Sequence, residues 1–339
     1  MALLRYILWR LLQAIPLLLG ISLLSFFLIN LAPGDFLAEQ RLNPANSADL
    51  IRQLEDDFGL MRQITDADTG EVRRVETGFV FQYGTWLKNI FWKGDFGFSF
   101  STRQPVWNVI WDRLLNTLWL SAMALLLGVG LALPLGVIAA VRQYKWEDMA
   151  SSFVAFIGLS IPNVLLALLF LMLAASTGCL PLGGMRSLDF DNLSLIGKVI
   201  DLLRHVLAPA LVLGTAVMAV YMRQMRGNLL DVLDQDYVRT ARAKGLSEST
   251  VIVKHGTRNA VNPIITLFGY SLSDLLSGSI LVENVLAWPG LGRTVVEALF
   301  AKDLYLVMAS VIMASVMLII GNLLADLVLA WNDPRIRLR

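Results

Sequence analysis

The chain has 339 residues, of which 56% are hydrophobic and only 16% are charged, and its mean hydropathy is +0.63. This composition is too apolar for an ordinary soluble domain and indicates a membrane protein. The formal net charge of +1 gives no general attraction to nucleic acid, and the single Cys179 excludes an intrachain disulfide.

Six hydrophobic stretches are each long enough to cross a bilayer, which takes about 20 apolar residues. The first is too long for the apolar core of a signal peptide, so we expect it to be retained as a transmembrane helix. The expected fold is an all-α membrane protein of about six transmembrane helices. The predicted spans lie near residues 9–31, 114–141, 149–176, 206–222, 263–283 and 304–331.

Orientation follows from the basic residues, which favour the cytoplasmic side in short loops. With the N-terminus inside, half of the 28 Lys and Arg residues fall in the inside segments, and only five fall in the outside segments 177–205 and 284–303. Both termini are therefore expected to be cytoplasmic. The expected organisation is an N-terminal helix (1–31), an extracytoplasmic insertion (32–113), a five-helix core (114–331) with a cytoplasmic loop (223–262), and a tail (332–339).

The 32–113 segment is too polar for lipid and too long for a simple loop, so we expect it to fold on the outer face. Residues 47–58 show helical periodicity with Ser47 as a cap, and residues 79–92 form a second amphipathic candidate. Between them, TDADTGEVRRVET predicts a hairpin or a mobile tip. Asp66 and Asp68 do not extend into an EF-hand pattern, so we expect no metal site there.

A polar stretch, DYVRTARAKGLSEST at residues 236–250, interrupts the apolar runs. It predicts a short helix that ends at Gly245 and a second helical stretch that begins after Ser247 and continues to Pro263. Its small side chains permit close approach of a partner, and its basic side chains supply charge at the edge. A solvated cytoplasmic loop explains the same residues, so both interpretations stay open at this point.

Asp274 lies near the middle of the fifth span, where an ionisable side chain is costly and is a functional candidate. It shares a helix stripe with Tyr270 and Gly278. Either this stripe lines a translocation pathway, or Asp274 pairs with a neighbouring helix. For Asp326 in the last span we expect contact with a basic loop residue, and for His205 a position at the outer membrane interface.

The sequence WPGLGR, in the outside segment before the last span, predicts a tight and rigid turn because a proline and two glycines are close together. Its tryptophan suits a membrane interface. Neither a nucleophile–base pair nor a G-x-x-x-x-G-K-[ST] phosphate loop occurs in the chain, so we expect no catalysis by it. The residues of this candidate outer loop are Trp288, Pro289, Gly290, Leu291, Gly292 and Arg293.

Several stretches in order resemble the dipeptide/oligopeptide permease family of ABC importers. Arg239-Thr240-Ala241-x-x-x-Gly245 aligns with the E-A-A-x-x-x-G motif of such permeases, although Arg239 and Thr240 replace the Glu and the first Ala. "RLLQAIPLLLGISLLSFFLINLAPGDF", "KGDFGFSFSTRQPVW", "SIPNVLLALLF", "GCLPLGG", "LVENVLAWPGLGR" and "NDPRIR" are similar to other segments of the family's B-type subunit. Of the usual I-x-L-P downstream of the motif, only Pro263 matches.

The resemblance implies a type I ABC importer permease fold with no cofactor bound by this chain. ATP and Mg would be bound by two partner ATPase subunits, and the other expected partners are a second homologous permease, an extracytoplasmic substrate-binding protein and membrane lipid. The outer loop would act as a gate. The implied ATPase-coupling residues are Arg239, Thr240, Ala241, Arg242, Ala243, Lys244, Gly245 and Leu246.

The implied function is that of a permease subunit in the inner membrane of a prokaryote, forming half of a pathway for peptides or similar solutes. Related permeases serve oligosaccharides, nickel chelates or glutathione, so the solute stays open. The alternative is a self-sufficient secondary transporter or channel. A secondary transporter would need an ion or proton relay and often has inverted repeats, but the sequence shows only one mid-span acid and no detectable repeat. An intramembrane enzyme would need paired acids or clustered histidines at membrane depth, which the sequence lacks.

Overall fold

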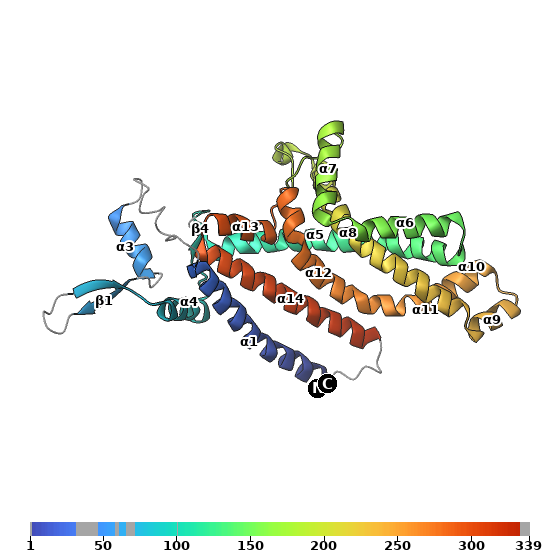
Figure 1. The fold of residues 1–339 in the computed structure, drawn as a ribbon, viewed down its shortest axis with the longest axis horizontal. Coiled ribbons are helices and arrows are strands. Elements are labelled where there is room, and N and C mark those ends of the chain that lie inside the picture. Colours follow the sequence, from blue (N-terminus) through green and yellow to red (C-terminus); the bar gives the residue numbers. More distant parts are fainter. Residues whose placement is uncertain (1, 32–46, 58–60, 66–71, 100, 333–339) are drawn as a thin grey trace. The chain divides into compact units, whose positions relative to one another are not determined.

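Helices account for most of the chain (Figure 1). The computed structural model describes residues 2–31, 47–57, 61–65, 72–99 and 101–332. Two short antiparallel sheets accompany the helices. The chain divides into two compact units, one made of 1–11, 115–293 and 316–339, the other of 12–114 and 294–315.

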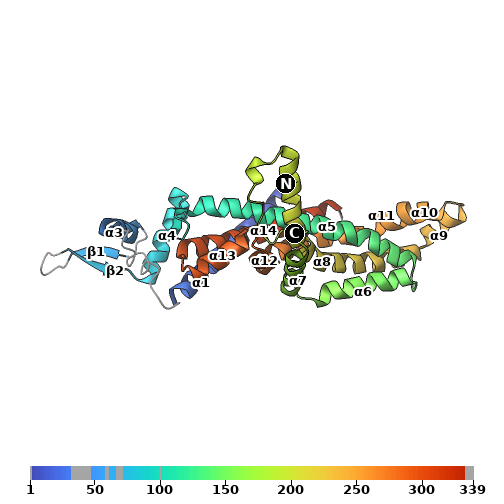
Figure 2. The ribbon, with the colours of Figure 1, turned by 90° about the horizontal axis from the view of Figure 1, so that it is seen from above.

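The first unit is built on α5 (Val106–Val141, from residue 115), α6 (Trp146–Ser160), α7 (Asn163–Thr177), α8 (Leu195–Leu233) and α12 (Asn262–Val285). Its apolar core includes Leu120, Leu213, Tyr221, Met225 and Trp288. In both views α6 runs beside α8 (Figures 1 and 2).

Glycines bring α5 and α8 together. A Cβ added at Gly128 would lie 2.8 Å from the carbonyl oxygen of Gly214, and a Cβ added at Gly214 would lie 2.8 Å from that of Ala124. The two backbones are therefore too close for any side chain at the crossing, as in other tightly packed membrane helices. This contact fixes α5 and α8 as one rigid pair.

The predicted third span, 149–176, is not one helix. It consists of α6 and α7, which are bent by 104° relative to each other. The bend falls at Ile161 and Pro162, because proline lacks an amide hydrogen and disfavours helical geometry in the residue before it. The stretch is apolar throughout, so hydropathy alone could not show the break.

The predicted fourth span, 206–222, is also incomplete. Helix α8 has 39 residues and is about 58 Å long, which is well above the ~30 Å of a bilayer's hydrocarbon core. His205 lies inside this helix rather than at its outer start, and it is buried. The expectation that His205 starts the span was therefore wrong, and its position at the membrane interface stays a prediction.

Among the residues that the structure describes, four helices are long and apolar enough to cross a membrane, or five if α6 and α7 together form one span. They are α1 (Ala2–Leu31), α5, α8 and α14 (Leu304–Asn332). Helix α12 carries Asp274, Glu283 and several serines among its apolar residues, and several of its side chains lie outside the described residues. The total of six spans stays a prediction.

The second unit contains most of α1 together with α3 (Ala48–Asp57), β1 (Met61–Thr65), β2 (Val72–Glu76) and α4 (Phe79–Lys93). The helices predicted around 47–58 and 79–92 are confirmed. So is the hairpin, since β1 pairs with β2 from Met61↔Glu76 to Thr65↔Val72. Its tip, with Asp66 and Asp68, lies outside the described residues.

A buried carboxylate organises the rest of the second unit. Asp303 precedes α14 and accepts a hydrogen bond from the Leu306 amide, at 3.2 Å, as an N-cap residue does. It also accepts from the hydroxyls of Ser99 and Ser101, at 2.7 and 2.9 Å. These contacts join the short sheet of β3 (Phe98–Ser99) and β4 (Gln104–Pro105) to the start of α14.

Candidate functional site

The polar stretch folds as the sequence predicts up to Gly245. Helix α9 (Asp236–Ala243) ends there, and Gly245 has φ +77°, a left-handed value that favours glycine. The Gly245 amide donates to the Arg242 carbonyl at 2.9 Å, and the Leu246 amide donates to the Ala241 carbonyl at 3.4 Å. This pair of bonds is a Schellman motif, so the turn after α9 is fixed by the backbone itself.

The buried side of α9 is small and apolar. Val238 is 0% exposed and Ala241 is 6% exposed, and both pack with Val251 against the end of α8. The opposite side carries the polar and basic residues predicted for coupling. Those that are exposed are Arg239, Thr240, Arg242, Ala243, Lys244, Gly245 and Leu246. Seven of the eight predicted coupling residues are therefore accessible, and the eighth, Ala241, anchors the helix.

An ion pair bridges the two sides of the Gly245 turn. The Arg242 guanidinium donates to both carboxylate oxygens of Glu248, at 3.2 and 2.8 Å. This hydrogen bonding raises the pKa of Arg242 and lowers the pKa of Glu248 below its usual range. Both groups are thus charged at neutral pH, and the pair favours the bent arrangement of the turn.

Beyond the turn, α10 (Glu248–Thr250) leads into η2 (Val251–Thr257), a π-helix, and then into α11 (Arg258–Ala260). The second predicted helical stretch is confirmed in extent but not in type. Ser247 precedes α10 as predicted, yet its hydroxyl pairs with Thr250 at 2.8 Å instead of capping the backbone. π-Helical turns are rare and occur frequently at functional sites.

The π-helix is held against α8. A Cβ added at Gly256 would lie 3.0 Å from a methyl carbon of Leu229, so only glycine fits this contact without displacing its neighbour. Nearby, the Asn228 side chain donates to the Ala260 carbonyl at 3.0 Å. The segment from α9 to α11 therefore forms one anchored body at the end of α8, where both views place it (Figures 1 and 2).

A second clamp lies close by on α8. Arg226 donates to both oxygens of Asp148 on α6, at 2.7 and 2.8 Å, and Asp148 is only 4% exposed. The Tyr144 amide also donates to this carboxylate, at 3.0 Å. Two parallel bonds to a planar guanidinium fix orientation as well as distance. The N-terminal end of α6 is thereby held to the C-terminal part of α8.

The candidate outer loop is closed by a buried glutamate near the end of α12. Glu283 is 0% exposed; it accepts a hydrogen bond from the Thr117 hydroxyl at 2.8 Å and from the Arg293 amide at 3.1 Å. The Leu291 amide in turn donates to the Thr117 oxygen at 2.8 Å. Leu291 and Arg293 are in the first turn of α13 (Leu291–Phe300). Glu283 and Thr117 therefore cap α13 from distant positions, where the helix dipole favours an anion.

The two glycines of the loop have a different purpose from the one that the sequence suggested. Neither Gly290 nor Gly292 has a positive φ, so the turn does not require them. A Cβ at Gly290 would lie 2.5 Å from the carboxyl carbon of Glu283, and one at Gly292 would lie 2.7 Å from Cα of Ile280. They are glycines because the carboxylate and α12 occupy the space of a side chain.

Trp288 and Pro289 complete the loop. Trp288 is 0% exposed and its indole donates to the Asn116 carbonyl at 3.1 Å, so its ring packs inside the protein, and its position at the membrane interface stays a prediction. The Gly290 amide donates to the Trp288 carbonyl at 2.8 Å around Pro289, which is a tight γ-turn. The Asn116 side chain donates to the Pro289 carbonyl at 2.8 Å. The predicted rigid turn is confirmed.

The pathway candidates lie on α12, which connects the coupling segment with the outer loop. Asp274 is at the middle of this helix and its side chain is exposed in the single chain. The side chains of Tyr270 and position 278 lie outside the described residues. Helix α12 has 24 residues and is about 36 Å long, so the three predicted sites are separated along it and do not form one cluster.

Asp326 contacts a basic residue as predicted, but that residue lies on a helix instead of in a loop. It accepts from the Tyr6 hydroxyl at 2.7 Å and from the Arg10 guanidinium at 2.8 Å, both on α1. Sequence reasoning missed Glu283 and Asp148. The cost of a carboxylate in an apolar run, which singled out Asp274, also applies to Glu283 and could have found it.

No group of three or more His, Cys, Asp or Glu side chains among the described residues is placed to hold a metal ion. The candidate sites present contact surfaces and charge: a basic surface at one end of α12, an acid at its middle and a carboxylate-capped loop at its other end.

Comparison with known proteins identifies the family of the chain. The family model "Binding-protein-dependent transport system inner membrane component" matches residues 132–338, and its N-terminal counterpart, "Binding-prot-dependent transport system membrane comp, N-term", matches residues 3–121. The chain is 39% identical to the oligopeptide transport system permease protein AppB of Bacillus subtilis (strain 168), over 98% of both chains. It is 35% identical to the glutathione transport system permease protein GsiC of Escherichia coli (strain K12), over 98% of this chain and 99% of that one.

Proposed function

Because the chain belongs to the family of binding-protein-dependent transport system inner membrane components and is a permease subunit of an ABC importer, we propose that it forms half of a peptide pathway. The relatives named for oligopeptide and glutathione transport support a peptide-like solute. A second permease would supply the other half, and two ATPase subunits would bind ATP and Mg. The chain itself would bind no cofactor and hydrolyse nothing.

The observation that carries the proposal is the surface of α9 and its turn. Interfaces are enriched in Arg and aromatic residues, and this surface presents three basic side chains beside Tyr237 and Leu246, which are 43% and 41% exposed. The segment is also anchored to α8 and continuous with α12 through η2 and α11. We infer that an ATPase docks on it and moves it as a rigid body.

Gly245→Pro tests this dock. Proline cannot adopt φ +77° and would remove the amide bond to Arg242, so the Schellman turn should be lost. We expect the ATPase subunits no longer to co-purify, or hydrolysis no longer to respond to solute. Ser247→Pro is the matched control, since Ser247 already has φ −60°. Normal coupled uptake by Gly245→Pro would contradict the assignment.

We propose further that the stripe of Tyr270, Asp274 and Gly278 lines the pathway and that the loop of residues 288–293 gates its outer end. Asp274 is supported by its central place on α12 and by its exposure in the single chain. A mid-membrane carboxylate requires water or a polar partner, and a water-filled pathway provides the first.

Asp274→Asn separates pathway lining from structural pairing. If the carboxylate lines the pathway, the importer should assemble in full yield but take up cationic peptides less well than neutral ones. Complex yield and the uptake of both peptide classes are to be measured side by side. Loss of assembly with equal loss for both classes would show structural pairing, and unchanged uptake of both would remove Asp274 from either role.

A further inference from the structure

The loop between α7 and α8, residues 178–194, is long for a connection with so little secondary structure of its own. Apart from the short η1 (Phe190–Asn192) it contains neither helix nor strand. Connections longer than ~12–15 residues without secondary structure are uncommon, and many of those that occur are functional. Residues 183–187 of this loop are held by contacts at both ends, and we call this segment the strap.

The first end of the strap lies against the entry to the outer loop. The Gly184 amide donates to the Leu286 carbonyl at 3.1 Å, and a Cβ added at Gly183 would lie 2.7 Å from the same oxygen. The next residue, Ala287, has φ +51°, which is a strained value for alanine. Its carbonyl accepts from the Arg293 guanidinium at 2.7 Å. The strap and Arg293 together therefore hold the strained entry of the outer loop.

The second end of the strap is bound to the start of α8. The Ser187 amide donates to the Asp201 carboxylate at 2.9 Å, and the Asp201 side chain is only 13% exposed. Hydrogen bonds to a charged acceptor are stronger than those between neutral groups. Met185 packs against the apolar core between the two ends. Beyond the strap, the Lys198 ammonium of α8 lies over the Phe190 ring at 5.5 Å from its centre, so the rest of the loop also folds onto α8.

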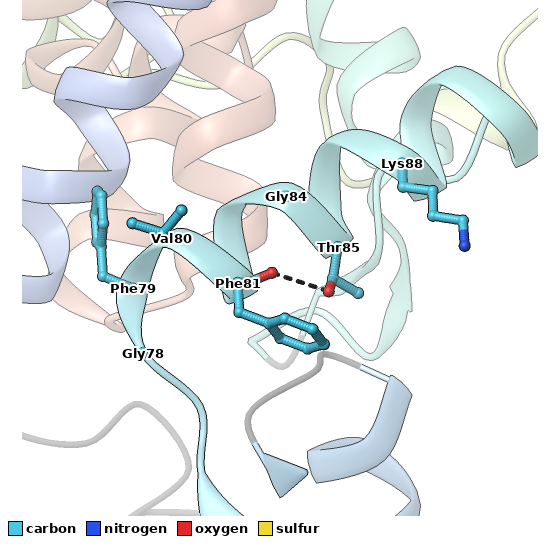
Figure 3. Close-up of a pocket in the computed structure, with 7 residues that line it drawn as sticks. All are labelled: Gly78, Phe79, Val80, Phe81, Gly84, Thr85 and Lys88. Atoms are coloured by element: carbon cyan, nitrogen blue, oxygen red, sulfur yellow. Dashed lines mark hydrogen bonds between the residues drawn. The ribbon is translucent and has the colours of Figure 1, made fainter.

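A segment that contacts two elements can transmit movement between them, and a feature of one element cannot. An open pocket of about 710 Å³ along α4 is of the second kind, because its described lining, Gly78 to Lys88, comes from that helix and the glycine before it (Figure 3). The strap is of the first kind: its contacts reach the outer loop on one side and α8 on the other.

We propose that the strap attaches the outer loop to α8 and that Asp201 is a positioning residue for the gate. The inference rests on the proposed function, since it takes the coupling segment as the ATPase dock and residues 288–293 as the gate. Val238 and Ala241 of the coupling segment pack on the last turn of α8, whereas Asp201 is near its first turn. A movement imposed on the dock therefore reaches the outer loop through α8 and the strap.

The strap adds a second attachment to the one that α12 provides. Helix α12 joins the coupling segment to the outer loop through the chain itself, with η2 and α11 between them. A loop held only at its connection to α12 can still turn about that connection. Attachment to a second helix fixes its direction as well, so the outer loop takes one defined position for each position of α8.

Asp201→Ala removes the acceptor of the Ser187 amide and should detach the strap from α8. His205 keeps its bond to the main-chain carbonyl of residue 201, at 2.8 Å, so α8 should stay intact. The reporter is Val285→Cys, half-buried beside Leu286, in a Cys179→Ser background. The assembled importer is placed in phospholipid vesicles, and the rate of reaction with an impermeant maleimide is measured before and after trapping with ATP and vanadate.

Trapping should change the rate in the parent, and Asp201→Ala should reduce this change several-fold while the ATPase subunits still co-purify. Asp201→Asn keeps an acceptor oxygen and should restore the full change. Gly183→Ala, which places a Cβ against the Leu286 carbonyl, should act like Asp201→Ala from the other end of the strap. Asp191→Ala, at an exposed acid of the same loop, is the control and should behave as the parent.

The outcomes separate the strap from the proposed function. A full change in both Asp201→Ala and Gly183→Ala would overturn the strap alone, because the dock and the gate would still be coupled. No change in the parent would contradict the gate itself, and the strap with it. Recovery by Asp201→Asn distinguishes positioning from a general loss of structure.

A second measurement leaves the contacts of the strap intact. Spin labels replace Leu182 and Val199, which are 60% and 56% exposed, so assembly should not suffer. The distance between the labels should stay the same on trapping, while the reactivity at position 285 changes, because the strap and the start of α8 move together. A change in this distance would overturn the proposal.

Discussion

At the scale of single residues, the outer loop depends on one buried charge. A carboxylate without donors would be costly at Glu283, but Thr117 and the first turn of α13 satisfy it. The loop glycines leave room for that carboxylate, because its atoms occupy the place where a side chain at position 290 would begin. The residue types at positions 283 and 290 therefore depend on each other.

Gly290→Ala should destabilise the loop through overpacking, by about 1–3 kcal/mol. The expected consequence is raised reactivity of a cysteine introduced at Arg293, together with a lower midpoint of thermal unfolding. Shortening the carboxylate in Glu283→Asp should partly rescue Gly290→Ala, because it vacates the same space. Additive losses in the double variant would contradict this coupling. Gly130→Ala serves as the control, since its added Cβ meets nothing within 4 Å.

At the scale of elements, the sequence predicted most of the helices and missed how several of them end. Periodicity located α3, α4 and the helix that stops at Gly245, since these depend on local patterns. Hydropathy did not predict the bend at Pro162 or the full length of α8. It is an average over a window of residues, so it shows neither a break within an apolar stretch nor the more polar ends of a long helix. The position of Glu283 in an apolar run could have singled it out, but its partner Thr117 could not be predicted, because it is 166 positions away.

The π-helix η2 joins the coupling segment to α12 with one residue more per turn than an α-helix would use. Deleting Val253, which is 65% exposed, should let this turn close as an α-helix. The wide turn that sets the arrangement of the coupling segment relative to α12 would then be lost. We expect the importer to assemble but hydrolysis to lose its response to solute.

The control for this deletion is removal of Leu188, a fully exposed residue in the loop between α7 and α8. That variant should keep coupled uptake. If deletion of Val253 also kept it, the π-helix would have no part in transmitting the ATPase movement. Complex yield must be followed in both variants, so that a failure to assemble is not taken for a failure to couple.

At the scale of the whole molecule, the membrane orientation remains a prediction from the distribution of basic residues. We expect the coupling segment and α3 to lie on opposite sides of the membrane. Cysteines at Ser247 and Asp49, in a Cys179→Ser background, should react with an impermeant reagent from inside and from outside, respectively. Both positions are exposed in the structure. Labelling of both from the outside would overturn the model with both termini inside.

The close fit of Glu283 to Gly290 also has an evolutionary consequence. The Glu283 carboxylate fills the space that a side chain at position 290 would need. The residue type that position 290 can accept therefore depends on the residue type at position 283, seven residues earlier in the sequence. Among homologous permeases, a side chain at the second position should appear only in lineages that have shortened or lost the acid at the first. The two positions should therefore covary, and Gly130, where a side chain meets nothing, should vary independently of both.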